Sequence, residues 1–439
     1  MNIEVSFGES IDKYSILELK QKKINDPNKL LEIKKEIDIL CVCLQYKTKY
    51  KFYYNLLMYV NEKIWDMTDN IKMINVDNPQ FSLLSNDIFE FNQKRFRIKN
   101  WFNLLINSNI KEQKSYVTTH CKIVINNEQT LYNKIAEINY LSLDYDIITF
   151  DSPKLLTTIK KIFNLTTFIY KDEDLNKLPK PNIINIEDVN ISEKKNRAIF
   201  EFPPIIYING GMFGDFIQSL SVINEKFYET GRKGNLFISN KGDKFRYGLE
   251  NTYNDTYQTI IKQNYINDYK IYNNESYDID LTMWRNNPKL FKVNWHDLYK
   301  DTYKVEWGKH IWLDSAYDEK WNDIILINTT QYRWTININY NLLNNQFLNK
   351  LVFISSDINE YFFFIKTTNL NIPFYEFNNF SDLCIAIKSC KLFVGSLSAP
   401  LAIAHAFNKA RIIGICNCNG DNILISNLKN IWDNVRYAV

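Results

Sequence analysis

The chain contains few of the residues that bind metals or form disulfides. Its 439 residues include 4 histidines and 7 cysteines. Two cysteine pairs, Cys41-Val-Cys43 and Cys416-Asn-Cys418, are CxC pairs, and the sequence has neither an HExxH motif nor two CxxC pairs. We therefore expect no protein-bound metal. An odd number of cysteines does not suit a disulfide framework and favours a cytoplasmic location.

Long apolar runs and a strong net charge are also missing. No stretch approaches the ~20 apolar residues of a membrane span, and the N-terminus MNIEVSFGES lacks the basic and apolar segments of a secretory signal. The 53 Lys and Arg residues against 50 Asp and Glu give a net charge of +3, too small for a nucleic-acid-binding surface unless it is locally concentrated. The densest basic run, Lys20–Lys23, is better explained as a solvated helix face. We expect no transmembrane segment and no nucleic-acid partner.

The first quarter of the chain, residues 1–116, has helical periodicity. A short strand is expected at Ile3–Ser6, followed by a helical hairpin that is broken near Asp26-Pro27. Two further helices are expected over Tyr53–Ile74 and Phe81–Ile106, with the turn Asp77-Asn78-Pro79 between them. This part is therefore predicted to be an all-helical domain.

Residues 117–196 change to mixed periodicity and are predicted to form a small α/β segment with a linker. The expected strands are Lys122–Ile125, Ile147–Phe150 and Thr166–Tyr170, the expected helices are Glu128–Ile138 and Ser152–Ile162, and the expected linker pieces are Leu178–Pro181 and Glu187–Asn196. The pattern leaves open whether this segment is its own domain or extends the next sheet.

From Ile205 onward strands and helices alternate in two runs. This predicts two doubly wound, Rossmann-like halves over residues 197–315 and 316–439, joined near Trp307–Trp321. Expected strands, after the first at Ile205–Ile208, are Asn235–Ser239, Tyr269–Tyr272, Ile279–Met283, Ile324–Ile327, Leu351–Ile354, Phe374–Phe377, Leu392–Val394 and Ile412–Ile415. Expected helices include Tyr253–Gln263, Asp357–Ile365, Asp382–Lys388 and Ser398–Phe407. The facing carboxyl edges of the two sheets are a common place for nucleotide-sugar chemistry.

The stretch Ile205–Phe227 is a strand, a glycine turn and an amphipathic helix. Gly210, Gly211 and Gly214 allow a ligand to approach the backbone, and the free N–H groups at the helix start attract anions such as phosphate. Asp215 follows directly. A carboxylate there is either a cap or dipole partner of the helix, or a base that accepts a proton from an attacking hydroxyl.

Three polar clusters follow strands of the second half. In the first, Thr329, Gln331 and Arg333 either clamp a diphosphate or form an ordinary capped loop. In the second, Asp357 and Glu360 form a helix-capping pattern, which becomes a ligand site for a sugar or ribose only if neighbouring loops complete it. The third cluster is a strand, a glycine turn and a helix start, in which the phosphate-binding candidates are Ser396, Ser398 and Pro400.

The N-terminal stretches SFGESIDKYSILELK, VNEKIWDMTDNIK and FNQKRFRIKNWFN, followed by EQKSY, resemble a small bacterial helical domain of unknown function. Because the function of that domain is unknown, the resemblance says nothing about activity. The charged residues of its opening motif either line a polar site or form a salt-bridged helix surface. They are Glu9, Asp12, Lys13, Glu18 and Lys20.

Two later stretches, GGMFGDFIQSLSVI and FVGSLSAPLAIAHAFNKARIIGI, resemble the signatures of the heptosyltransferase-like glycosyltransferases, which have the twin-Rossmann GT-B fold. The resemblance implies that Asp215 is the catalytic aspartate, that Arg333 contacts the donor diphosphate and that Glu360 binds the donor sugar or nucleoside. The second signature departs from the family's D-S-G-P-x-H pattern, with Leu397 in place of Asp, Ala399 in place of Gly and Ala402 in place of His. The next histidine, His405, is expected to pack on the helix.

These observations predict an inverting, metal-independent glycosyltransferase. It would move a sugar from a nucleotide-diphosphate sugar, which is a co-substrate and not a bound cofactor, to a hydroxyl of a glycan or protein. A sugar-nucleotide epimerase and a catalytically inactive sugar-binding or assembly protein remain as alternatives. The N-terminal helices carry more aromatic surface than a hairpin readily buries, for example at Trp65, Phe89 and Phe91, so some of it is expected to pack on the α/β core or to form a homo-oligomer.

Overall fold

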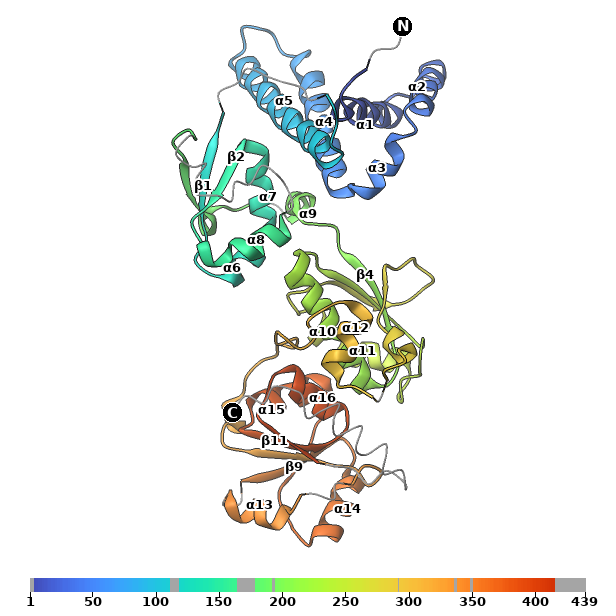
Figure 1. The fold of residues 1–439 in the computed structure, drawn as a ribbon, viewed down its shortest axis with the longest axis vertical. Coiled ribbons are helices and arrows are strands. Elements are labelled where there is room, and N and C mark those ends of the chain that lie inside the picture. The colour runs from blue at the N-terminus through green and yellow to red at the C-terminus, as the bar shows by residue number, and fades with distance from the viewer. Residues whose placement is uncertain are drawn as a thin grey trace. The chain divides into compact units, whose positions relative to one another are not determined.

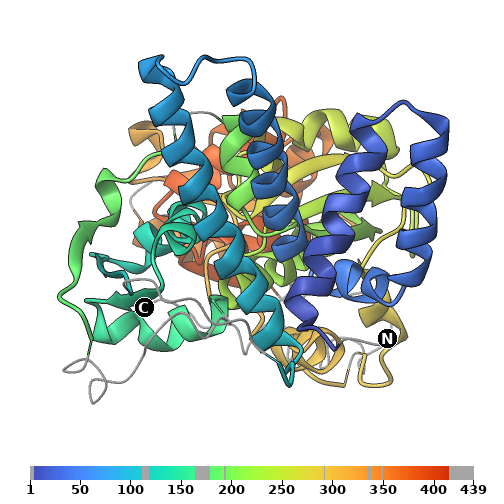
Figure 2. The ribbon, with the colours of Figure 1, turned by 90° about the horizontal axis from the view of Figure 1, so that it is seen from above.

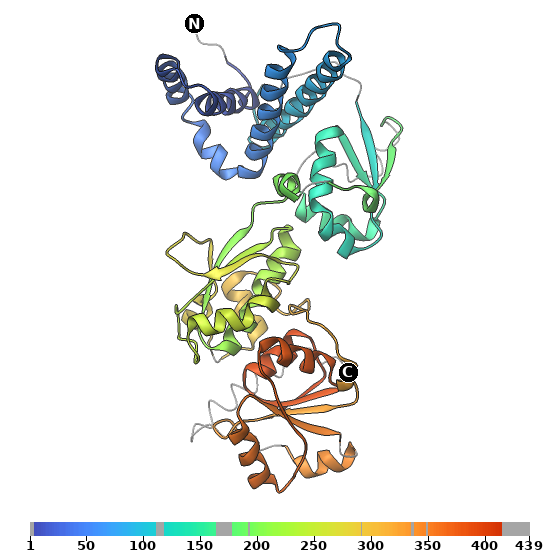
Figure 3. The same cartoon turned by 180° about the vertical axis from the view of Figure 1, so that it is seen from behind.

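The computed structural model describes residues 4–110, 118–163, 178–191, 194–290, 292–334, 338–347 and 350–414. The chain divides into two compact units, Met1–Pro203 and Pro204–Val439. Figure 1 shows the ribbon and Figure 3 shows it from behind. The predicted boundaries at residues 116, 196 and 315 stay predictions. The predicted fold class is confirmed, with an N-terminal helical region and twin Rossmann-like parallel sheets.

The first unit begins with helices, of which α1, α2 and α5 start at polar side-chain caps. They are α1 (Phe7–Lys23), α2 (Pro27–Ile39), α3 (Cys43–Lys49), α4 (Lys51–Ile71) and α5 (Pro79–Leu105), and α1, α4 and α5 lie side by side in Figure 2. Asp26 caps α2 and Asn78 caps α5, each with proline as the next residue. Both predicted breaks are therefore confirmed. The predicted strand is wrong within the described residues 4–6, because the Ser6 side chain instead accepts from the Glu9 amide and caps α1.

The rest of the first unit is a small parallel α/β layer. Its elements are β1 (His120–Val124), α6 (Glu128–Asn133), α7 (Ile135–Asp144), β2 (Ile147–Phe150), α8 (Leu156–Ile162), β3 (Asn182–Asn185) and α9 (Lys194–Phe200). The strand order is β2-β1-β3, so this layer has its own sheet and does not extend the next one. The predicted helix Glu128–Ile138 is two helices that meet at Lys134. The predicted strand Thr166–Tyr170 lies outside the described residues.

The predicted linker of this layer is partly wrong. Between its two pieces lies β3, which pairs with β1 although Ile183 is 69% exposed, and the second piece ends inside α9. An edge strand with an exposed apolar residue between proline and acidic residues has no period-2 burial pattern to reveal it.

Part of the aromatic surface of the helical region is buried within the first unit. The Tyr59 ring lies 5.8 Å from Phe200 of α9 and 6.3 Å from Phe91 of α5. Phe52 of α4 packs 4.8 Å from Phe202, measured between ring centres. These contacts join the helices to the small α/β layer. A homo-oligomer through the helices stays a prediction.

The first half of the second unit is a four-stranded parallel sheet of order β6-β5-β4-β7. Its elements are β4 (Ile205–Gly210), α10 (Phe213–Thr230), β5 (Gly234–Ser239), α11 (Leu249–Ile260), β6 (Ile266–Ile271), β7 (Ile279–Asp280) and α12 (Trp295–Tyr303). The predicted strand Ile279–Met283 ends early, because the backbone enters a short 3-10 helix at Met283–Asn286. Strand β4 is buried on both faces, as expected for the centre of a parallel sheet.

The second half is a five-stranded parallel sheet of order β10-β9-β8-β11-β12. Its elements are β8 (Ile325–Asn328), α13 (Tyr340–Gln346), β9 (Leu351–Ser355), α14 (Ile358–Thr368), β10 (Phe374–Glu376), α15 (Phe380–Ser389), β11 (Leu392–Ser396), α16 (Ala399–Ala406) and β12 (Arg411–Gly414). Helices α13 and α14 cover one face of this sheet, and α15 and α16 cover the other (Figure 1). The predicted strands and helices of this half are confirmed within a few residues, whereas α13 was not predicted.

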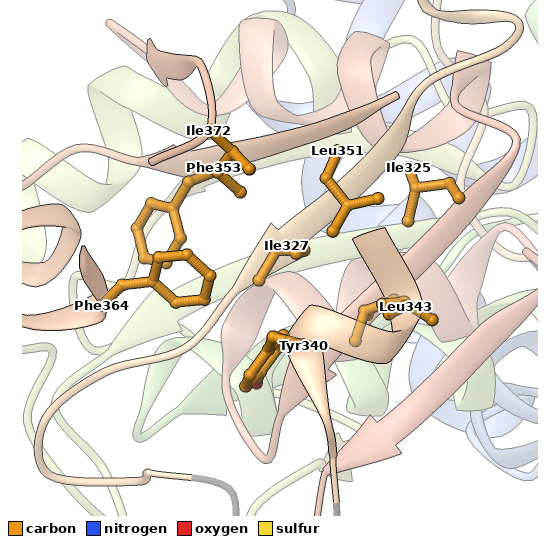
Figure 4. Packing of buried hydrophobic residues seen from close by; sticks show 9 residues of the cluster. Ile325, Ile327, Tyr340, Leu343, Leu351, Phe353, Phe364 and Ile372 are labelled. Carbon is orange, nitrogen blue, oxygen red and sulfur yellow. The ribbon is translucent and has the colours of Figure 1, made fainter. Parts of the chain in front are cut away.

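The core under α13 and α14 fixes the middle of this sheet. Figure 4 shows Ile327 of β8 among Phe353 of β9, Phe364 of α14 and Tyr340 of α13. Ile327, Phe353 and Phe364 are fully buried. Such a core loses contacts when even one methyl group is removed.

Shortening Ile327 to valine should destabilise the second unit by about 0.5–1.5 kcal/mol, the usual cost of a buried Ile→Val change. The exposed Ile358 is a matched control, because its replacement by valine leaves no cavity. Thermal unfolding of both variants measures the difference. Equal midpoints would show that this cluster is loosely packed.

Candidate active site

The two sheets of the second unit each have a point where the strand order reverses. In the first sheet it lies between β4 and β7, and in the second between β8 and β11. Loops that leave the carboxyl ends of such strand pairs part to opposite sides and open a crevice, where ligands of open α/β sheets bind. The predicted site residues follow the ends of these strands.

The glycine turn after β4 requires at least two of its glycines. Gly211 has φ +111°, a region that side chains disfavour. A Cβ atom on Gly210 would lie 2.3 Å from the Lys241 carbonyl oxygen, so the backbone after β5 occupies that place. A side chain at position 210 would therefore clash with the backbone after β5.

Asp215 lies in the first turn of α10 and does not cap the helix, because the N-cap is Met212. Its Oδ2 accepts a hydrogen bond from Arg285 Nη2 at 2.8 Å, and its side chain is 28% exposed. Protein that surrounds Asp215 and excludes water raises the pKa of its carboxyl group. The positive charges of Arg285 and Arg333 oppose this rise only in part, and the negative charge of Asp243 adds to it.

Arg285 is a site residue that the sequence reasoning missed. It lies 70 residues after Asp215 and reaches it because β7 pairs directly with β4, with Tyr207 opposite Ile279. One signal was available, since Arg285 follows a strand of the first half much as Arg333 follows β8.

The predicted residues of the second half share one sheet edge. Asn328 at the end of β8 is in register with Gly395 of β11, and Ile327 is in register with Phe353 of β9. The loops that carry Arg333, Glu360 and Ser398 therefore leave neighbouring strands at the same edge.

The loop after β8 contains both internal and accessible groups. Thr329 is 1% exposed and its hydroxyl donates to the Arg333 carbonyl at 3.4 Å, so this predicted ligand serves the loop itself. The Arg333 amide donates to the Thr330 hydroxyl at 3.0 Å, which tightens the turn. Gln331 is exposed. Arg333 is the loop residue whose positive charge acts on Asp215, so this loop of the second half lies near the first turn of α10.

Glu360 lies in the first turn of α14, whose N-cap is Asp357 as predicted. In a capping box Glu360 would accept a hydrogen bond from the Asp357 amide. Here that amide donates to Ser355 Oγ instead, at 3.1 Å. Ser355 Oγ in turn donates to Glu360 Oε2 at 2.7 Å. Burial raises the pKa of Glu360, and the positive charge of Arg246, from the first half, opposes that rise. Glu360 is thus held at the sheet edge by a side chain of β9.

The start of α16 presents backbone donors. Ser398 is the N-cap residue, but among the described residues its hydroxyl accepts no hydrogen bond from the amides of the first turn. It donates instead to the Ser396 carbonyl at 3.1 Å and to Asn328 Oδ1 at 3.4 Å. Pro400 occupies the first turn. Ser396 is fully buried, and its hydroxyl has no partner among the described residues. The free amides at the start of α16 suit an anion.

The two signature turns meet. A Cβ atom on Gly214 would lie 3.6 Å from both the Cα and the amide nitrogen of Ala399, so the starts of α10 and α16 are in contact. Leu397 is 8% exposed and Ala402 is fully buried, so apolar side chains fill the places of the family's Asp and His.

His405 is packed on the helix as expected. It is buried between the rings of Trp307 and Trp312, at 5.1 and 5.0 Å, and its Nδ1 lies 3.3 Å from Gln218 Nε2. Burial lowers the pKa of His405 well below its ordinary value, which keeps the imidazole neutral. This histidine joins the two halves through buried contacts with α10 and with the segment that links them.

Four of the five charged residues of the N-terminal motif are paired with other helices of their own unit. Glu9 pairs with Lys99 at 2.6 Å, Lys13 with Glu36 at 2.8 Å and Glu18 with Lys47 at 2.5 Å. Asp12 is 1% exposed and accepts from Arg95 Nε at 2.9 and 3.0 Å. Of the two interpretations, the geometry favours the salt-bridged one.

Among the described residues no three His, Cys, Asp or Glu side chains lie close enough together to hold a metal ion, and metal independence stays a prediction. In the part of the chain that the structure describes, no helix is both long and apolar enough to cross a membrane.

Residues 1–140 match a family of unknown function (DUF6165). The match runs past the predicted boundary at residue 116 into α7. It agrees with the resemblance noted for the N-terminal helices. No curated protein matches the sequence significantly.

Solved structures similar to this chain include three glycosyltransferases. One is a glycosyl transferase of family 9 from Veillonella parvula, with 10% identity and a TM-score of 0.35, covering 48% of this chain and 80% of that one. The others are from E. coli: heptosyltransferase WaaC with ADP-2-deoxy-2-fluoro heptose (7% identity, TM-score 0.33, 48% and 88% covered) and ADP-heptose lps heptosyltransferase II (13%, 0.32, 48% and 84%).

Proposed function

We propose that the second unit transfers a sugar from a nucleotide-diphosphate sugar to a hydroxyl group of a glycan or protein acceptor. The observation that supports this most is the meeting of the two turns, in which Gly214 contacts Ala399 and the charge of Arg333 acts on Asp215. A carboxylate, an arginine and two helix starts then lie near one another where the two halves meet. This combination suits a leaving diphosphate beside an attacking hydroxyl.

In the proposed reaction Asp215 accepts the proton of the acceptor hydroxyl as its oxygen attacks the anomeric carbon. The bond between that carbon and the diphosphate oxygen breaks, and the configuration inverts because attack and departure are on opposite faces. Arg333 and the backbone N–H groups of the Ser396–Pro400 turn, to which Pro400 itself contributes none, stabilise the negative charge that develops on the diphosphate. Glu360 binds sugar or ribose hydroxyls through its oxygens. Gly210 and Gly211 shape the turn that faces the substrate, because the space beside them is taken by the Lys241 carbonyl and the Arg285 guanidinium.

The alternative of an inactive sugar-binding or assembly protein has one specific observation in its favour. Leu397 and Ala402 are buried apolar residues where the family signature has Asp and His. Incubation with a panel of nucleotide sugars, with and without acceptor glycans, separates the candidates by product. Transfer or donor hydrolysis supports the proposal, a changed sugar on the intact nucleotide supports an epimerase, and binding without turnover supports the inactive protein.

We expect transfer to continue at an unchanged rate in the presence of a metal chelator. In the proposed site Arg333 and backbone amides stabilise the negative charge of the diphosphate, a task that divalent cations have in many other enzymes. The rate with the preferred donor, measured before and after chelation, checks this. Loss of activity that Mg²⁺ or Mn²⁺ restores would contradict it.

A further inference from the structure

Arg285 is fixed in the first half by two neighbours. Its Nη2 donates to Asp215 Oδ2 at 2.8 Å, and its guanidinium carbon lies 4.3 Å from the centre of the Trp284 ring. The side chain is 19% exposed. Its buried Nη1 has no hydrogen-bond partner among the described residues, so Asp215 is the side chain that orients this guanidinium.

The glycine turn is shaped to admit this arginine. A Cβ atom on Gly211 would lie 2.1 Å from Arg285 Nη2 and 2.9 Å from its guanidinium carbon. Gly211 also has φ +111°, which other residues rarely adopt. The space that a side chain at position 211 would need is therefore occupied by the Arg285 guanidinium.

We propose that Arg285 is a positioning residue for the proposed transfer reaction, and that it holds the Asp215 carboxylate in place as an anion ready to accept a proton. The proposal rests on the function proposed above. It also gives Gly211 a second task, because only a residue without a side chain leaves space for the guanidinium against the turn.

The surroundings explain why such a partner is needed. Asp215 is packed so that burial favours its neutral form, and a neutral carboxyl group cannot act as a base. The charged and titratable groups that face it are Arg285 after β7, Arg333 after β8, Asp243 after β5 and Tyr299 of α12. Asp243 opposes ionisation and the Tyr299 hydroxyl is kept neutral by burial. Arg285 is the cation in direct hydrogen-bond contact with the carboxylate.

The test is a titration of Asp215 in the full chain. Aspartate is labelled at its carboxyl carbon, and the Asp215 signal is assigned as the one that disappears in Asp215→Asn. In Arg285→Gln we expect the titration midpoint to move upward by about 1–3 pH units, the effect of losing an adjacent opposite charge. In Arg285→Lys, which keeps the charge, most of that change should be recovered. The acid limb of kcat/KM, measured with the donor found in the panel, should move in the same direction.

Arg232→Gln is the matched control, since Arg232 belongs to the same half but lies past the opposite end of α10 and bonds the Pro204 carbonyl. It should leave the Asp215 midpoint unchanged. An Asp215 midpoint that is the same in Arg285→Gln and the natural protein overturns the inference, whether or not transfer is seen. A moved midpoint in a protein that turns over no donor leaves the pairing intact and refutes the proposed function instead.

Discussion

Replacement of Asp215 by asparagine should lower turnover by about 10²–10⁴-fold, the usual effect of losing a general base. Asparagine has nearly the same shape, so the turn after β4 and the contact of Gly214 with Ala399 should persist. The amide can still accept a hydrogen bond from Arg285, but it cannot take the proton of an acceptor hydroxyl. The rate of sugar transfer, with circular dichroism to verify the fold, measures the effect.

Asp297→Asn provides the control for this experiment. Asp297 is also an acid in the first turn of a helix in the same half, but it is exposed on α12 and its partner is Asn294. A loss common to both variants would point to helix stability rather than proton transfer. Unchanged turnover in Asp215→Asn would refute the role of the base outright.

The pH dependence of the natural protein follows from the same carboxyl group. Burial raises the pKa of Asp215. The proposed base therefore becomes ionised only at a pH above the ordinary pKa of aspartate, about 3.9. Activity should therefore rise with pH through this higher value and be lost as pH falls below it. This limb is expected in kcat/KM, which reports the free enzyme.

The sequence revealed those parts of the site that depend on a few consecutive residues. The strand, glycines and helix around Asp215 carry their own periodicity and turn chemistry, and the structure has them at β4 and α10. The same is true of the cap Asp357 and of the turn before α16. Local pattern is enough where one strand end and one helix start make the feature.

Features that depend on distant residues were missed or misjudged. Arg285 reaches Asp215 only through the pairing of β7 with β4, and strand order is not written in local periodicity. For Thr329 the sequence left a ligand contact and a loop contact open, and in the structure its hydroxyl donates to the Arg333 carbonyl. A polar residue after a strand has no sequence signal that tells which way its side chain points. Helix α13 was missed because its sequence, YNLLNNQ, mixes few apolar residues with asparagines.

A second large effect is expected in the helical region, where Asp12→Ala should lower the local free energy of unfolding by about 1–3 kcal/mol, the cost of leaving buried hydrogen-bonding groups without this acceptor. Asp12 is 1% exposed and binds Arg95 of α5 and Asn61 of α4. Its loss removes the carboxylate from Arg95 and one of two acceptors from Asn61, whose Nδ2 also donates to Ser15 Oγ at 2.8 Å. Because α1 is joined to two other helices through this one carboxylate, the effect should spread over α1, α4 and α5.

Amide hydrogen exchange resolved along the chain measures this effect, since the amides of these three helices should exchange faster while those of the second unit do not change. Asp66→Ala is the control, because its ion pair with Lys23, at 2.9 Å, joins side chains that are 51% and 33% exposed, and such surface pairs contribute about 0–1 kcal/mol. If the two variants behave alike, the Asp12 carboxylate does not hold the helices together. The charged residues of the N-terminal motif would then have to be reconsidered as a polar site, the interpretation that their pairing now disfavours.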